Sequence, residues 1–201
     1  MNTEKVCLFL NGEQPKSIPD LKRYKIVCAT DGAYQFLKTK QIVPHFISGD
    51  FDSIENIPES IEVIHTPNQD FTDFDKVLQI LYDKGFKTVH VYGASGKEQD
   101  HFLGNLHTAL QWKTKLDLTF FDNHGYYFLA DKMIKIENCM DKTVSLIPLP
   151  EATGITTVGL QYALDNETLA FGERIGTRNK AVKNTISVTF ETGSLFLFIN
   201  D

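Results

Sequence analysis

Two aspartates, Asp50 and Asp52, stand one residue apart directly after the short apolar segment 45–47. In an extended segment alternate side chains share a face, so both carboxylates could turn toward one hard cation while Phe51 points into the body of the domain. Gly49 before the pair predicts the end of a strand, which is where open α/β sheets place their ligand crevice. For such a pair alone, a surface turn rich in aspartate would be the favoured explanation.

Further acidic clusters in the same half of the chain favour a site. Asp31 lies between a predicted strand and a predicted helix, where it is either a site residue or a helix N-cap. Asp73 and Lys76 lie three residues apart near the start of another predicted helix. Both can reach a ligand held at that helix N-terminus, and an ordinary surface ion pair is the competing explanation.

The loop 93–101 carries the last of these clusters. It lacks the spacing of a Walker A loop, of a dinucleotide-binding glycine motif and of a nucleophile elbow. Its glycines nevertheless allow backbone amides to approach a phosphate, and Asp100 and His101 could bind a metal or a substrate.

Alternating strands and helices must position these loops. Apolar runs predict strands at residues 6–10, 25–29, 61–65, 88–92 and 117–121. Helices are predicted after Gly32, over residues 74–81, where Thr72 or Asp70 could be the cap, and over residues 101–112. This order predicts a mainly parallel sheet covered on both faces, with the acidic loops along one edge.

The character of the sequence changes near residues 122–125. Short β-type segments follow at residues 126–129, 143–149, 160–164, 187–190 and 194–199. The turn 191–193 predicts a hairpin between the last two. We therefore expect an α/β domain over residues 1–123 and an all-β sandwich domain over residues 124–201.

Composition bounds the class of protein. The 201 residues are 42% apolar, enough for a real core, and the net charge of −6 argues against a nucleic-acid groove. The polar start and the short apolar run 6–10 predict no signal segment and no membrane span, hence a cytoplasmic protein. Cys7, Cys28 and Cys139 are widely spaced in apolar segments and predict buried free thiols.

Taken in order, the motifs resemble those of the thiamin pyrophosphokinase family, whose members move a diphosphate from ATP to the hydroxyl of thiamin, giving thiamin diphosphate and AMP. The matching segments are 31–33, 49–53, 69–73 with Lys76, 93–96 with Asp100, His101 and Asn105, 159–162, and 176–179. The resemblance implies an ATP- and Mg²⁺-binding α/β domain and a thiamin-binding β-sandwich. It also implies a homodimer whose active sites combine the first domain of one subunit with the second domain of the other.

The resemblance assigns roles to the matched residues. The implied Mg²⁺ ligands are Asp50, Asp52, Asp73 and Asp100. These four and Asp70 make up the predicted catalytic set, in which Asp70 or Asp73 could take the hydroxyl proton. The implied nucleotide-binding residues are Asp31, Thr72, Lys76, Ser95, Gly96, Lys97, His101 and Asn105. The implied thiamin-binding residues are Gln69, Tyr162, Thr177 and Asn179, the last two from the partner subunit.

Two departures from the family pattern keep other functions open. The family often has Gly-Gly-Arg before its Asp-His pair, whereas this chain has Gly-Lys-Glu at residues 96–98, where Lys97 could replace the arginine as a point charge. Arg178 stands where a serine is common. The alternatives are a non-catalytic nucleotide or thiamin-phosphate binding protein, and a related diphosphotransferase or phosphohydrolase acting on another alcohol such as a pterin. The retained like charges favour an enzyme.

Overall fold

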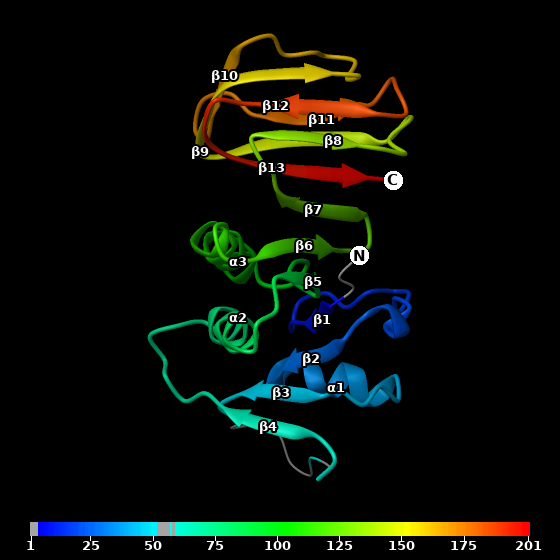
Figure 1. Cartoon of the computed structure of the whole chain (residues 1–201), viewed down its shortest axis with the longest axis vertical. Coiled ribbons are helices and arrows are strands. Elements are labelled where there is room, and N and C mark those ends of the chain that lie inside the picture. The colour runs from blue at the N-terminus through cyan, green and yellow to red at the C-terminus, as the bar shows by residue number, and fades with distance from the viewer. Residues whose placement is uncertain (1–3, 52–56, 58) are drawn as a thin grey trace. The chain divides into compact units, whose positions relative to one another are not determined.

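The computed structural model describes residues 4–51, 57 and 59–201. Contacts along the chain divide it into two compact units, Met1–Asn123 and His124–Asp201. Figure 1 labels the elements of both units along the chain. The described helices all belong to the first unit, and none of them is both long and apolar enough to cross a membrane.

The first unit is built on a parallel sheet. Its strands are β1 (Lys5–Phe9), β2 (Ile26–Thr30), β3 (Phe46–Gly49), β4 (Glu62–His65), β5 (Thr88–Tyr92) and β6 (Asp117–Phe121). They lie in the order β4-β3-β2-β1-β5-β6, and every pairing among them is parallel. The predicted parallel sheet is confirmed. Because the chain builds outward from β1 on both sides, the strand order reverses between β1 and β5, where open α/β sheets bind ligands.

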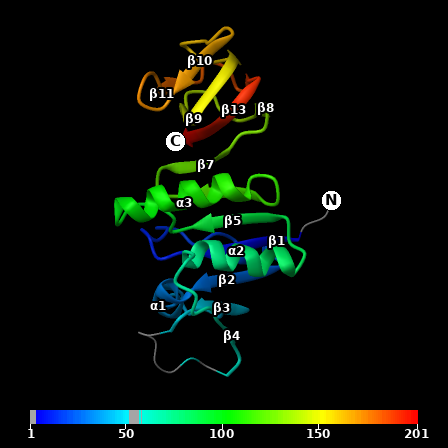
Figure 2. The same cartoon turned by 90° about the vertical axis from the view of Figure 1, so that its left-hand side faces the viewer.

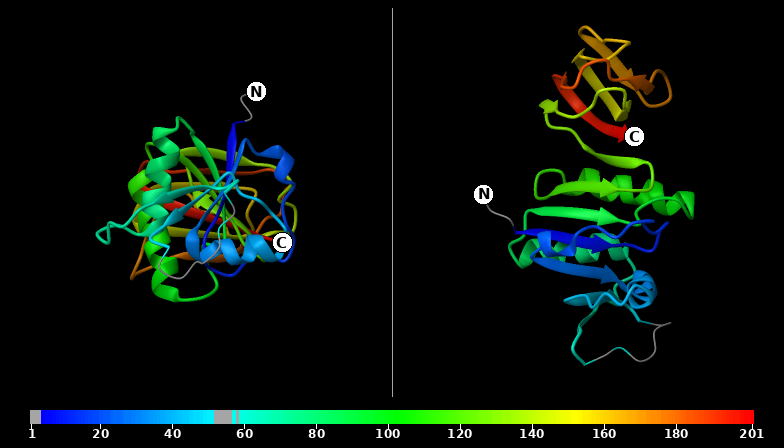
Figure 3. Two further views of the ribbon diagram at one scale, coloured as in Figure 1. Left: turned by 90° about the horizontal axis from the view of Figure 1, so that it is seen from below. Right: turned by 90° about the vertical axis from the view of Figure 1, so that its right-hand side faces the viewer.

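Helices cover both faces of this sheet. The helical segments are η1 (Leu21–Arg23), α1 (Asp31–Thr39), α2 (Asp73–Asp83) and α3 (Gln99–Trp112). Figure 2 shows α2 and α3 in front of one face, and the right-hand view of Figure 3 shows α1 in front of the other. Cys7 and Phe9 of β1 join Ala33 and Leu37 of α1 in one buried core. On the opposite face, Phe74 of α2 packs edge-on against Phe120 of β6.

The start of α2 decides between the two predicted caps. Thr72 is the N-cap, and its hydroxyl oxygen accepts a hydrogen bond from the backbone N–H of Asp75 at 3.2 Å. The four apolar residues whose spacing predicted this helix are all buried. The burial confirms the amphipathic pattern. The cap fixes where the helix begins, and so places the polar residues next to Thr72 at the helix N-terminus.

The second unit is all-β and every pairing within it is antiparallel. Its strands are β7 (Gly125–Leu129), β8 (Met133–Ile136), β9 (Thr143–Val158), β10 (Glu167–Ala170), β11 (Gly176–Lys180), β12 (Ile186–Thr189) and β13 (Thr192–Asn200). The long β9 pairs with β10, β11, β12 and β13. It therefore forms the centre of this unit and contributes to a buried core of mostly aliphatic residues.

Two expectations for this unit are wrong. Residues 160–164 do not form a strand, since only Leu160 bridges to Ala181, although Leu160 and Leu164 are buried as their apolar character suggests. The turn 191–193 does not make a hairpin, because β12 pairs with β8 and β9 whereas β13 pairs with β7 and β9. The backbone N–H of Glu191 donates to the carbonyl of Thr153 on β9, and β12 and the start of β13 pair with β9 in one continuous register, so the chain runs on along β9 through this turn.

The three cysteines are free and buried, as predicted. Cys7 and Cys28 lie on the adjacent parallel strands β1 and β2, and Cys139 lies between β8 and β9. Burial raises the pKa of each of the three thiols above its ordinary value. Neutral thiols in apolar surroundings are poor nucleophiles, so these side chains contribute packing.

Candidate active site

Acidic side chains from separate strand ends meet in one cleft of the first unit. The cleft has a volume of about 520 Å³ and opens at the carboxyl ends of the parallel strands. The predicted residues that line it are Asp31, Asp50, Gln69, Asp70, Thr72, Asp73, Lys76, Asp100, His101 and Asn105. The topology gathers them because loops that follow parallel strands leave the sheet at the same edge.

Asp31 connects two of these loops. It is the first residue of α1, and the N-cap position belongs to Thr30, so the N-cap explanation of Asp31 is wrong. One carboxylate oxygen of Asp31 accepts from the backbone N–H of Gly32 at 2.6 Å, and the other accepts from the N–H of Phe51 at 3.1 Å. Asp31 thereby holds the loop that carries Asp50.

The backbone at Phe51 differs from the extended conformation that we expected. Phe51 has a φ of 61°, in the left-handed region, so alternation of side chains across this segment does not hold. The ring does pack against the buried core, as predicted. Asp52 lies outside the described residues, and its place beside Asp50 therefore stays a prediction.

Asp50 is tied to the neighbouring strand and loop. Its carboxylate accepts from the side-chain amide of Gln69 at 3.2 Å, and its backbone carbonyl lies 3.2 Å from Nε2 of His65. The ring of His65 in turn stacks on Phe51 with 6.3 Å between centroids. The predicted thiamin contact Gln69 and the predicted metal ligand Asp50 are thus direct neighbours.

The electrostatics of Asp31 show that the carboxylates of the cleft act on one another. Burial raises the pKa of Asp31 above its ordinary value, and the charges of Asp73 and Asp50 raise it further. The hydrogen bonds that Asp31 accepts from two backbone N–H groups lower this pKa. Like charges held together in this way favour the binding of a cation.

Lys76 is the cation that the chain itself supplies. Its ammonium lies 2.7 Å from a carboxylate oxygen of Asp73, and the side chain is only 11% exposed. It also donates to the backbone carbonyls of Thr66 and Asn68 at 2.8 and 3.2 Å. Lys76 therefore forms an ion pair and also lies in the cleft, where it fixes the loop before α2 and orients Asp73.

The glycine-containing loop after β5 borders the same region. Gly93 and Gly96 have φ values of 71° and 84°, which side chains rarely adopt, and a Cβ on Gly93 would lie 2.3 Å from the carbonyl oxygen of Leu10. The amide of Asn105 donates to the carbonyl of Ala94 at 2.8 Å and so holds this loop against α3. Asn105 therefore has a positioning role that its sequence did not reveal.

The predicted phosphate contacts of this loop lie beside the cleft. Ser95 and Lys97 line a smaller pocket of about 80 Å³ that shares Asn11 and His101 with the cleft, and Gly96 is not among the lining residues of either. The ammonium of Lys97 donates to the side-chain carbonyl of Asn11 at 3.1 Å. Lys97 thus reaches the edge of the cleft through Asn11.

The predicted site did not include Asn11 and Phe71, which are among the residues that line the cleft. Asn11 follows β1, and its position directly after a buried strand is the same signal that identified the other site residues. Phe71 lines the cleft with 55% of its side chain exposed. An exposed aromatic ring inside a polar loop is the signal that could have identified it, since such rings offer a stacking surface to a flat ligand.

The described residues offer donors for a metal without a complete set of ligands. Among them, no group of three or more acidic, histidine or cysteine side chains lies close enough to hold an ion by itself. Mg²⁺ is commonly bound through one or two carboxylates together with water and substrate phosphates. The carboxylates of Asp50, Asp73 and Asp100 in one cleft fit that kind of site.

The other predicted substrate residues belong to the second unit. Asn179 is buried, its side-chain oxygen accepts from the backbone N–H of Tyr162 at 3.0 Å and of Lys180 at 2.8 Å, and its amide donates to the carbonyl of Tyr162 at 2.6 Å. The side chain of Tyr162 is 67% exposed, and Thr177 is also exposed. Asn179 thus fixes the backbone of Tyr162, which presents its ring to solvent.

Two family models match the chain. The model described as the thiamin pyrophosphokinase catalytic domain matches residues 20–120, and the model described as the thiamin pyrophosphokinase vitamin B1 binding domain matches residues 132–195. Thiamin pyrophosphokinase 1 of Caenorhabditis elegans is 27% identical over 214 residues, covering 95% of this chain and 87% of the relative. Thiamine pyrophosphokinase of Bacillus subtilis is 27% identical over 199 residues, covering 91% and 93%.

Solved structures share the fold. The crystal structure of thiamine pyrophosphokinase from Bacillus subtilis has a TM-score of 0.83 at 23% identity and covers 97% of this chain and 98% of its own. A thiamin pyrophosphokinase family protein from Enterococcus faecalis has a TM-score of 0.87 at 18% identity, covering 98% and 99%. The two matching family models together span most of the sequence, and one of them falls in each unit. This chain belongs to the thiamin pyrophosphokinase family.

Proposed function

We propose that this chain transfers the diphosphate group of ATP to the hydroxyl of thiamin and releases AMP. The observation that carries the proposal is the cleft in which carboxylates from separate loops converge around Lys76. A transfer of this kind asks little covalent chemistry of the protein, which must clamp a polyphosphate and align an alcohol. Family membership supplies the substrates, and none of the named relatives favours a non-catalytic binder or a pterin substrate.

We assign Mg²⁺ to the carboxylates of Asp50, Asp73 and Asp100, with Asp52 as a further ligand outside the described residues. Burial is the main cause of the raised pKa of Asp31, and the charges of Asp73 and Asp50, which raise it further, support a cation in the cleft. Such an ion, when bound, neutralises the charge of the triphosphate. Asp31 anchors the Asp50 loop instead of serving as a ligand, because both its carboxylate oxygens already accept backbone N–H groups.

The chemical step forms one bond and breaks one. The thiamin hydroxyl oxygen attacks the β-phosphorus of ATP, the bond from that phosphorus to the oxygen shared with the α-phosphorus breaks, and AMP leaves. The hydroxyl proton passes to a carboxylate, for which we choose Asp70 over Asp73. Asp73 is engaged by Lys76 at 2.7 Å, whereas the carboxylate of Asp70 is exposed and makes no hydrogen bond or ion pair with the residues that the structure describes.

The remaining predicted residues bind the substrates. Backbone and side-chain donors of the loop at Ser95, Gly96 and Lys97 contact the phosphates, together with His101 at the start of α3. Gln69 and the exposed ring of Phe71 face the flat rings of thiamin. Within a homodimer, the partner subunit contributes its second unit, a β-sandwich whose exposed Tyr162 and Thr177 complete the thiamin site.

The test is an incubation of the protein with ATP, Mg²⁺ and thiamin in which the nucleotide products are resolved. AMP formed together with thiamin diphosphate supports the proposal, ADP indicates a monophosphate kinase, and no turnover indicates a binding protein. Asp73→Asn should lower the rate by several orders of magnitude, as loss of a charge at a metal clamp does. Asp83→Asn, at the other end of the same helix, is the matched control.

A further inference from the structure

A second cleft in the first unit lies apart from the acidic one. It has a volume of about 1020 Å³ and is lined by residues of β1, β5, β6 and the segment around η1, none of which belongs to the predicted site. Strand register places His90 beside Cys7 and Tyr92 beside Phe9, and Cys7, Phe9 and Tyr92 belong to the core under α1. Because α1 packs on β2 and β3, the cleft opens beside that helix, over β1 and β5.

Aromatic rings with polar edges form the floor of this cleft. The hydroxyl of Tyr24 lies 2.9 Å from Nδ1 of His90 and 3.0 Å from the hydroxyl of Tyr92. Phe121 stacks on Tyr92 with 5.2 Å between centroids and lies 4.9 Å from the ring of His90. Tyr24, His90 and Phe121 are only partly buried. The chain thus holds a fixed set of rings at the base of an open cavity.

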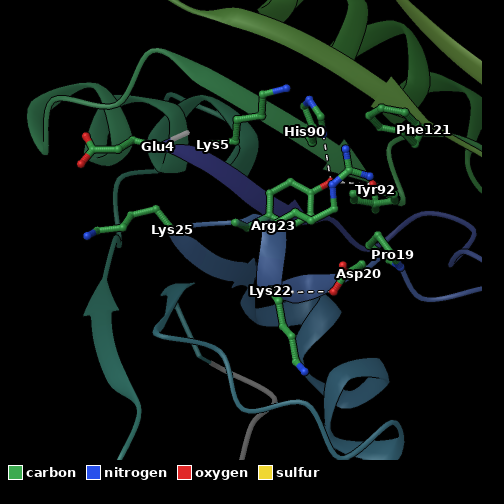
Figure 4. A pocket seen from close by; sticks show the side chains of 11 residues that line it. Glu4, Lys5, Pro19, Asp20, Lys22, Arg23, Lys25, His90, Tyr92 and Phe121 are labelled. Carbon is green, nitrogen blue, oxygen red and sulfur yellow. Dashed lines mark hydrogen bonds between the residues drawn. The ribbon is translucent and has the colours of Figure 1, made fainter. Parts of the chain in front are cut away.

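Cationic side chains surround these rings. Four cationic residues line the cleft, Lys5, Lys22, Arg23 and Lys25, against two acidic ones, Glu4 and Asp20, in a chain whose net charge is −6. In Figure 4 the side chains of Lys5 and Arg23 reach toward His90, whereas those of Lys22 and Lys25 point away from it. No ion pair within the described part of the chain includes Lys5 or Arg23.

The titration of His90 supports this placement of the charges. Burial, and then the positive charges of Lys5 and Arg23, lower the pKa of His90 to about 4. The ring is therefore neutral at pH 7 and lies near two cations, neither of which is ion-paired with a carboxylate of the described residues. An anion bound between Lys5 and Arg23 would be attracted by both positive charges, and the guanidinium offers the planar fork that fits a phosphate.

We propose that this cleft binds a phosphorylated small molecule that carries a flat ring. The phosphate contacts Arg23 and Lys5, and the ring lies against the exposed parts of Tyr24 and Phe121. The volume of the cleft is that of a small-molecule pocket. Such sites usually combine a rigid apolar or aromatic floor with a few charged groups. A nucleotide and a phosphorylated vitamin share this chemistry, and the experiment separates them.

The experiment follows the ring resonance of His90 by NMR in the full chain labelled with ¹³C-histidine, with His90→Gln assigning the signal. AMP, thiamin diphosphate and inorganic phosphate are titrated separately. We expect a saturable shift with AMP or thiamin diphosphate, at least tenfold weaker apparent binding in Arg23→Ala, and no change in Lys22→Ala, whose side chain points away. The ligand that binds more tightly identifies the source, and inorganic phosphate should bind more weakly than either.

Several results would overturn the proposal. The first is a flat titration with both ring-bearing ligands at millimolar concentration. The second is binding by Arg23→Ala that is as tight as binding by the wild type. The third is loss of the shift in Asp73→Asn, which would trace the signal to the acidic cleft. If the titration is flat and Arg23→Ala changes the oligomeric state of the protein in solution, a second copy of the chain covers this face. If Arg23→Ala does not fold, Arg23→Lys keeps the charge, loses the fork and should still weaken binding. Because turnover is not the readout, failure of the proposed function leaves this test intact.

Discussion

A single carboxylate, that of Asp31, sets the shape of the loop that carries Asp50. A left-handed conformation costs a bulky residue such as Phe51 about 1–2 kcal/mol, and hydrogen bonds to an ionised acceptor are strong enough to offset it. Glycine is required at position 49, because a Cβ there would lie 2.1 Å from the nearer carboxylate oxygen of Asp31. Asp31 and Gly49 therefore position the loop that carries Asp50, which we propose as a metal ligand.

Asp31→Asn tests this positioning role. A side-chain amide has one accepting oxygen in place of two, so either Gly32 or Phe51 loses its partner. We expect the fold to persist and kcat to fall by roughly 10²-fold, the order that a misplacement near 1 Å can cause. Steady-state kinetics and thermal unfolding of the variant, with Asp83→Asn as the control, check this. Unchanged kcat in a folded variant would contradict the role.

His90 predicts a dependence of stability on pH. Its pKa is lowered from 6.5 to about 4 in the folded chain, with burial as the main cause. The unfolded chain takes up a proton near pH 6.5 and the folded chain only near pH 4, so the stability contribution is present above pH 6.5 and is lost as the pH falls toward 4. His90→Gln should make the melting temperature less sensitive to acid over this window. His107→Gln, an exposed control, should behave like the wild type.

At the next level, helix α2 and strand β9 show what sequence can and cannot predict. The spacing of apolar residues in α2 is a local signal, and the cleft was predictable because the ends of parallel strands must converge. The full length of β9 was not predictable, because Pro148, Pro150 and Gly154 are residues that usually interrupt a strand. The strand continues through them because its two halves pair with different partners. The contact between Lys97 and Asn11 was not predictable either, because it joins residues 86 positions apart in the sequence.

The helices α2 and α3 are joined by a hydrogen bond that can be tested. The indole N–H of Trp112 donates to a carboxylate oxygen of Asp75 at 2.6 Å, and Trp112 is only 4% exposed. Asp75→Ala leaves this buried donor without a partner and should lower the free energy of unfolding by about 1–3 kcal/mol. Asp75→Asn keeps an acceptor and should lose less.

Urea unfolding measures this difference, with Asp83→Ala on the exposed end of α2 as the control. The midpoint should shift for Asp75→Ala while the dependence on urea stays the same, since the surface exposed on unfolding does not change. Equal midpoints for Asp75→Ala and Asp83→Ala would show that the bond to Trp112 contributes nothing to stability.

For the whole molecule, the residues proposed for the active site are divided between two units of the chain. The carboxylates belong to the unit Met1–Asn123, while Tyr162, Thr177 and Asn179 belong to the unit His124–Asp201. In a two-fold dimer, one subunit can supply the acids of a site and the other its β-domain groups. The proposed sharing therefore predicts that two inactive variants, each damaged in a different unit, restore activity when they are mixed.

Asp73→Asn and Asn179→Ala are suited to this mixing experiment. The first removes a carboxylate of the cleft, and the second removes the three hydrogen bonds through which Asn179 holds Tyr162 and Lys180. After mild dissociation and random exchange, about half of the dimers are mixed, and each mixed dimer has one site built from two unmutated halves. Activity should then approach roughly a quarter of the wild-type value. If subunit exchange is demonstrated by mass and activity stays at the sum of the two variants, each chain builds its site alone.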